Sequence, residues 1–165
     1  MVITVTDANI FIDLIKLDML GYLFGAELEI HTSSEIIDQL NESQQQQVSV
    51  FIHSRSLNVT YFTVNEIEEI QAETFPRALE FQDKTVYYLA KKIDAQVLTG
   101  DGALRKFCIT KQLTVHGIVW LFDRLLEKGL INYAVAIKKM EHLLSFNDRL
   151  PKTECLKRIQ DWGLL

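Results

Sequence analysis

Short apolar runs rich in β-branched residues alternate with longer segments of helically spaced apolar residues over the first 129 positions of the chain. The short runs predict strands and the periodic segments predict helices. Strands regularly separated by helices are typical of βαβ units on a parallel sheet. We therefore expect an α/β fold of three layers, α/β/α, with a central parallel sheet of about four to five strands. The predicted strands are 2–6, 27–31, 57–63, 95–99 and 113–115.

Several predicted helices have recognisable ends. Thr32 and Glu35 form a Thr-x-x-Glu pattern, which predicts a capping box ahead of the apolar residues that follow. Asn65 is expected to open another helix, which should end near Phe75 because a proline follows that residue. Gly129 is expected at the position just after a helix end.

The remainder of the chain, residues 130–165, shows a different pattern. It predicts two helices separated by a turn at 147–151, with no strand. A length of 165 residues fits one compact domain. We therefore expect a domain over 1–129 and a helical C-terminal extension over 130–165 packed on the same domain.

Composition narrows the class of protein. Hydrophobic residues make up 48% and charged residues 24%, which is ordinary for a globular fold and excludes disordered and fibrous classes. The two cysteines form no C-x-x-C motif and indicate reduced thiols. The N-terminus lacks a basic segment, and no apolar run approaches the about 18 to 20 residues of a membrane span. A cytoplasmic protein without a membrane segment is expected.

The net charge of −5, from 17 basic and 22 acidic residues, argues against broad electrostatic attraction to nucleic acid. Proteins that bind nucleic acid in that way usually carry a basic excess.

Carboxylates stand where the predicted strands end. Asp7 follows the first strand, Glu35 follows the second within one helical turn, and Asp101 follows the strand that ends at Thr99. Asp83 begins the helix that leads into that last strand. Ligands of open parallel sheets bind outside the carboxyl ends of the strands, so these side chains could share one site. Taken singly, each also has a structural explanation as a helix cap, a helix-dipole partner or a turn residue.

A shared acidic site requires a cation, because clustered carboxylates repel one another and partly protonate otherwise. Ligands that offer only oxygen favour a hard metal, and the four histidines lack zinc-like spacing. We therefore expect Mg²⁺ or Mn²⁺, whose usual substrates are phosphates and which can promote phosphodiester hydrolysis. Four of the 22 acids would then belong to one metal pocket, so the net charge overstates the repulsion of nucleic acid by the rest of the chain.

Together these motifs resemble the acidic quartet of the PIN-domain ribonucleases, and their order and spacing fit over 2–129. The residues that carry the resemblance are Asp7-Ala8-Asn9, Glu35, Asp83 ahead of Tyr88-Leu89-Ala90, Leu98-Thr99-Gly100-Asp101, and His116-Gly117 before a long amphipathic helix. The last of these is similar to a PIN subgroup with a helical C-terminal extension.

The resemblance implies a metal-dependent endoribonuclease. Its Mg²⁺ or Mn²⁺ ligands and catalytic acids would be Asp7, Glu35, Asp83 and Asp101. Asn9 and Thr99 would support this site by hydrogen bonding. Small bacterial members are often VapC-like toxins that a cognate antitoxin inhibits, commonly as dimers. The resemblance therefore implies an RNA substrate, an antitoxin partner and a homodimer.

Two assignments keep alternatives open. Glu80, three residues before Asp83, is an alternative third acid. Arg105 and Lys106 lie about one helical turn from Asp101 and are candidates to bind the RNA backbone. A solvated outer helix face explains both basic residues equally well.

Other function classes compete with the nuclease. A phosphatase of the haloacid dehalogenase type needs a second aspartate two residues after the first, where this chain has Asn9. A receiver-like signalling domain needs paired acids after the first strand, which Thr6-Asp7 does not supply. A PIN-like binding protein that acts through protein or RNA interaction, with little catalysis, is the third alternative.

Overall fold

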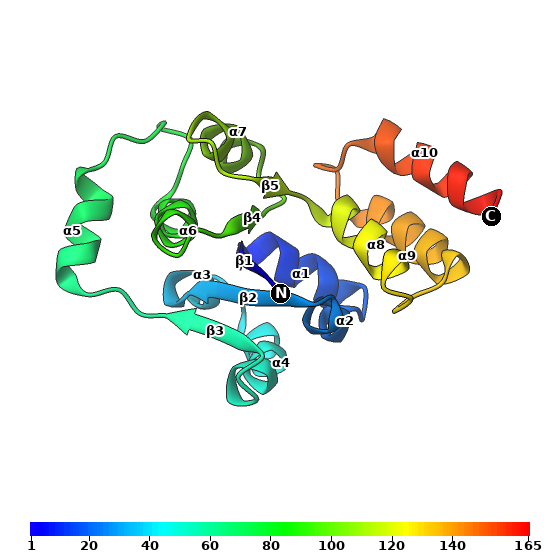
Figure 1. Ribbon diagram of the computed structural model, residues 1–165, viewed down its shortest axis with the longest axis horizontal. Helices are drawn as coiled ribbons and strands as arrows, with labels where there is room; N and C mark the ends of the chain where they lie inside the picture. Colours follow the sequence, from blue (N-terminus) through cyan, green and yellow to red (C-terminus); the bar gives the residue numbers. More distant parts are fainter.

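A five-stranded, all-parallel sheet lies at the centre of the computed structural model, which describes all 165 residues (Figure 1). The strand order is β3-β2-β1-β4-β5. This confirms the expected three-layer α/β fold with a parallel sheet. The strands are β1 (Val2–Thr6), β2 (Leu28–Ser33), β3 (Leu57–Thr60), β4 (Gln96–Leu98) and β5 (Val115–His116).

The chain forms ten helices. Most of them flank the sheet, and the last three lie beyond one end of it. Because parallel crossovers are right-handed, helices that follow β1 and β2 cover one face, and helices that follow β3 and β4 cover the other. In Figure 1 the last three helices gather at one end of the molecule and α5 lies at the other. The helices are α1 (Ala8–Lys16), α2 (Leu20–Gly25), α3 (Ser34–Asp38), α4 (Glu42–His53), α5 (Val64–Ala72), α6 (Phe81–Lys92), α7 (Gly102–Thr110), α8 (Ile118–Glu127), α9 (Tyr133–Phe146) and α10 (Lys152–Gly163).

The sheet has a topological switch point between β1 and β4. The chain moves outward from β1 to β3 and then crosses back to β4 on the other side of β1. Thr6 of β1 pairs in register with Leu98 of β4, so the next residues, Asp7 and Thr99, leave the sheet side by side. Crevices at such points are where open α/β sheets bind ligands.

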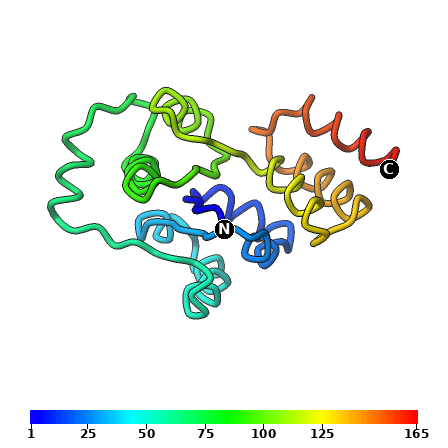
Figure 2. Tube along the Cα trace, in the orientation of Figure 1, coloured from blue at the N-terminus to red at the C-terminus, as the bar shows by residue number.

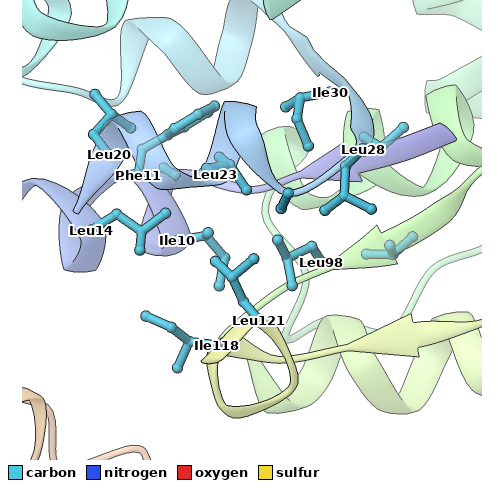
Figure 3. Close-up of a cluster of buried hydrophobic side chains, with 14 of the residues drawn as sticks. Ile10, Phe11, Leu14, Leu20, Leu23, Leu28, Ile30, Leu98, Ile118 and Leu121 are labelled. Atoms are coloured by element: carbon cyan, nitrogen blue, oxygen red, sulfur yellow. The ribbon is translucent and has the colours of Figure 1, made fainter. Parts of the chain in front are cut away.

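One hydrophobic core runs through both predicted parts of the chain. Figure 3 shows side chains of α1, α2 and α8 packed against those of β2 and β4. The same cluster includes Met140 and Leu143 of α9 and Trp162 of α10. The tube in Figure 2 shows the C-terminal helices, coloured yellow to red, as one group. Buried side chains of α9 and α10 therefore belong to the same cluster as those around the sheet. The side chains labelled in Figure 3 are Ile10, Phe11, Leu14, Leu20, Leu23, Leu28, Ile30, Leu98, Ile118 and Leu121.

The predicted capping box at Thr32 is wrong. Strand β2 continues to Ser33, and the Ser33 hydroxyl caps α3 by accepting the Ile36 N–H group. The buried Thr32 hydroxyl donates instead to the Thr6 carbonyl, 2.9 Å away. A long-range hydrogen bond inside the sheet thus outweighs the local capping pattern.

Two other helix predictions need correction. Helix α5 begins at Val64 with Thr63 as its cap, one residue earlier than expected, and ends at Ala72. The sequence prediction does not include α2, because this helix has only six residues. Residues with positive φ lie on either side of it, Asp18 at 54° and Glu27 at 56°. None of the helices has the length and hydrophobicity of a membrane span.

Candidate active site

Asp7 is a buried carboxylate at the switch point, only 2% exposed. It caps α1, since its Oδ1 accepts the Ile10 N–H group at 3.2 Å, and its Oδ2 accepts a hydrogen bond from the Thr99 hydroxyl. The pKa of Asp7 is raised to about 6, chiefly by burial and to a smaller extent by the charges of Asp83 and Asp101, against the lowering effect of the two hydrogen bonds.

Thr99 connects Asp7 to Asp101. Thr99 is fully buried, and its hydroxyl oxygen accepts a hydrogen bond from the backbone N–H of Asp101 at 2.9 Å. The same hydroxyl donates a hydrogen bond to the Asp7 carboxylate. Asp101 caps α7, and its Oδ1 accepts the Leu104 N–H group at 2.7 Å. The Thr99 hydroxyl therefore joins the Asp7 side chain after β1 to the Asp101 backbone after β4.

Asp83 approaches this pair from the first turn of α6. Its Oδ2 accepts the backbone N–H of Glu80 at 3.0 Å. Partial burial raises the pKa of Asp83, and the charges of Asp101 and then Glu80 raise it further. Glu80 itself is exposed at the N-cap of the same helix. Asp83, rather than Glu80, is the carboxylate whose charge acts on Asp7.

Glu35 is the fourth of the expected acids. It is half-buried in the first turn of α3, and its Oε2 accepts a hydrogen bond from the Ser34 hydroxyl at 3.2 Å. Its charge is not among those that shift the pKa of Asp7 or Asp83. Charge effects therefore connect Asp7, Asp83 and Asp101, whereas Glu35 is related to them only by its place in the first turn of α3, directly after β2.

The donor set suits a hydrated hard cation. No three His, Cys, Asp or Glu side chains lie close enough to one another to bind one metal ion jointly. Mg²⁺, however, commonly keeps several waters and is held through one or two carboxylates plus substrate phosphates. The Thr99 hydroxyl bonds to the Asp7 carboxylate and to the backbone N–H of Asp101. The two carboxylates offer only oxygen donors and fit that coordination.

Asn9 makes its hydrogen bond with the C-terminal extension. Its Oδ1 accepts from Nη2 of Arg149 at 3.0 Å, across 140 positions of sequence. Two residues earlier, Asn147 donates from Nδ2 to Oδ2 of Asp13 at 2.7 Å. Burial raises the pKa of Asp13, and the hydrogen bond from Asn147 and the charge of Arg149 oppose that rise. Sequence reasoning missed these contacts. The one sequence signal for them was Asp13, an aspartate within the otherwise apolar segment 11–15, which needs a polar partner if it is buried.

The two basic residues expected near the site differ in placement. Arg105 is half-buried on α7 and donates from Nη1 to the Val115 carbonyl at 3.4 Å. Lys106 is exposed on the same helix.

The acids stabilise helix ends, but capping alone does not account for them. A cap needs one acceptor oxygen, which an asparagine or serine supplies without charge. Burial and neighbouring charges raise the pKa of Asp7 and of Asp83, which costs folding free energy, and such arrangements cluster at functional sites. The arrangement can attract a divalent cation to the edge of the sheet.

A protein-family model described as PIN domain matches residues 3–163. The matched range includes the acidic edge of the sheet and both C-terminal helices. No curated protein matches the chain.

Proposed function

Because the chain belongs to the PIN-domain family, we propose that it is a metal-dependent endoribonuclease that hydrolyses RNA phosphodiester bonds. The observation that carries this proposal is the buried Asp7 carboxylate at the switch point, bound through the Thr99 hydroxyl to Asp101 and electrostatically coupled to Asp83.

In this proposal Asp7, Asp83 and Asp101 hold Mg²⁺ or Mn²⁺, and Glu35 completes the set as the family resemblance implies. An ion held there would supply an activated water and stabilise the leaving oxygen. The Thr99 hydroxyl fixes the Asp7 carboxylate in one orientation. The pKa of about 6 means that Asp7 must lose its proton before it binds a cation, so metal binding is expected to strengthen as pH rises through that value.

The wider biological role rests on the family resemblance. We propose a cytoplasmic toxin that forms a homodimer and is inhibited by a cognate antitoxin, with 1–129 as the nuclease domain and 130–165 as its extension. A small DNA-binding antitoxin in the neighbouring reading frame would support this role, and a neighbour of unrelated function would count against it.

The test is a cleavage assay on labelled single-stranded and structured RNAs with Mg²⁺, Mn²⁺ or excess chelator. We expect internal cleavage only with metal, and a loss of about 100-fold or more in Asp7→Asn and Asp101→Asn. Asp38→Asn, an exposed acid on α3, is the matched control and should keep full activity. All variants are purified in parallel, so that contaminating ribonuclease appears equally in each.

Activity that survives in both site variants, or in excess chelator, would overturn the proposal. Turnover of a small phosphomonoester without RNA cleavage would favour the phosphatase alternative. RNA or protein binding without any hydrolysis would favour the binding-protein alternative.

A further inference from the structure

We propose that a cavity beside the acidic site binds the nucleotide adjoining the cleaved bond, with Arg105 and Arg149 holding its phosphate. This inference rests on the proposed function and adds a subsite to it. The C-terminal extension thereby becomes part of the substrate-binding surface.

The cavity has a volume of about 690 Å³, within the range of about 300 to 1,000 Å³ that is usual for small-ligand sites. Thr99 and Gly100 line it, so it is continuous with the edge of the sheet that carries Asp7 and Asp101. The turn between α9 and α10 contributes Arg149 and Leu150 to its lining. A strand of nucleic acid with its scissile phosphate at the acids therefore has room for a neighbouring nucleotide here.

The charges that line the cavity favour a phosphate group. Each guanidinium offers five N–H donors, and Arg105 and Arg149 each make one side-chain hydrogen bond to the protein. The acidic lining residues already have partners. Asp13 accepts from Asn147, and Glu154 pairs with Arg158 on α10 at 3.4 Å. Unused arginine donors are suited to phosphate oxygens, which they bind in a fork geometry.

Gly117 helps to place Arg105. A Cβ atom at this position would lie 2.8 Å from Nη2 of Arg105, closer than atoms can approach without a shift. Glycine therefore allows the guanidinium to lie against the backbone ahead of α8. An alanine would displace the cation without removing its charge.

An apolar wall completes the cavity. Trp120 of α8 stacks on His116 with ring centroids 3.9 Å apart and planes 10° from parallel. Ile118 and Leu150 add aliphatic surface to the lining. A base can pack against this wall while its phosphate contacts the arginines, which gives the cavity the mixed character of a nucleotide subsite.

The test measures binding of a short fluorescent single-stranded RNA by anisotropy, at several salt concentrations, with Asp7→Asn as the non-cleaving background. We expect Arg105→Ala and Arg149→Ala each to weaken binding about tenfold, because each removes one phosphate contact. The salt slope, which is the change of log affinity with log salt concentration, should become shallower by about one in each variant. Gly117→Ala should weaken binding with Arg105 still present. Lys157→Ala, an exposed cation of α10 outside the cavity, is the control and should bind as the background does.

Arg149→Lys and thermal melting separate binding from folding. The lysine keeps the charge and should recover part of the affinity, whereas a purely structural role of Arg149 would appear as a lower melting temperature with unchanged RNA binding per folded molecule. Affinity and salt slope that stay at background levels in both alanine variants would overturn the inference.

The two proposals fail in different ways. RNA cleavage by the wild-type protein, with unchanged KM in both arginine variants, overturns the subsite and leaves the nuclease. RNA binding that depends on both arginines, without cleavage by the wild-type protein, overturns the nuclease and leaves the subsite. No RNA binding by the background protein overturns the subsite.

Discussion

Replacing Asp7 by asparagine is expected to stabilise the metal-free protein at alkaline pH. Burial raises the pKa of Asp7 from 3.8 to about 6, so the native state holds its proton more tightly than the unfolded state does. Stability therefore falls as pH rises from about 4 through 6 and then levels off. A shift of about two units corresponds to about 3 kcal/mol at pH 8.

Asparagine removes this penalty and keeps an oxygen for the Ile10 N–H group, but it loses the acceptor for the Thr99 hydroxyl. That loss costs about 1 kcal/mol. We therefore expect a net gain of about 2 kcal/mol at pH 8 and almost no net change at pH 4.5.

The assay is urea denaturation in excess chelator at both pH values, with the exposed Asp38→Asn as control. Added Mg²⁺ should stabilise the wild-type protein at pH 8 by mass action and leave Asp7→Asn nearly unchanged. An Asp7→Asn protein that is less stable than the wild type at pH 8, or that differs from it equally at both pH values, would refute the reasoning.

Three further changes follow from single contacts. Thr99→Val removes the hydroxyl between Asp7 and the Asp101 loop, so metal affinity and cleavage should fall about 10- to 100-fold. Isothermal titration with Mn²⁺ checks this, and an unchanged affinity would contradict it. Gly129→Ala should cost about 1 kcal/mol in urea denaturation, because this residue has a φ of 65°; an unchanged midpoint counts against it. Asn147→Ala leaves the buried Asp13 carboxylate without its donor and should cost about 1 to 3 kcal/mol. The cost should be larger at pH 8 than at pH 4.5, and the same cost at both would contradict it.

The order of strands and helices could be predicted because it depends on local patterns. The β-branched run at Val2–Thr6 and the periodic segment after it each carry their own signal. Element ends were less accurate where a distant partner decides them. Thr32 illustrates this, because its hydroxyl bonds to the Thr6 carbonyl in the neighbouring strand rather than capping the helix beside it.

The residues of the candidate site likewise differ in how far the sequence could place them. Asp7 directly follows β1 and Asp101 comes three residues after the end of β4, so the topology of a parallel sheet is enough to bring them to one edge. The contact between Asn9 and Arg149 spans 140 positions and depends on how the C-terminal helices fold back, which no local pattern encodes.

The most direct test of the metal site is a crystal structure of the protein soaked in Mn²⁺, with the ion located by its anomalous scattering. We expect a Mn²⁺ ion at the carboxyl edge of the sheet, bound by Asp7 and Asp101 and lost in Asp7→Asn crystals. A protein that cleaves RNA with Mn²⁺ while its crystals hold no ion at these two carboxylates would contradict it.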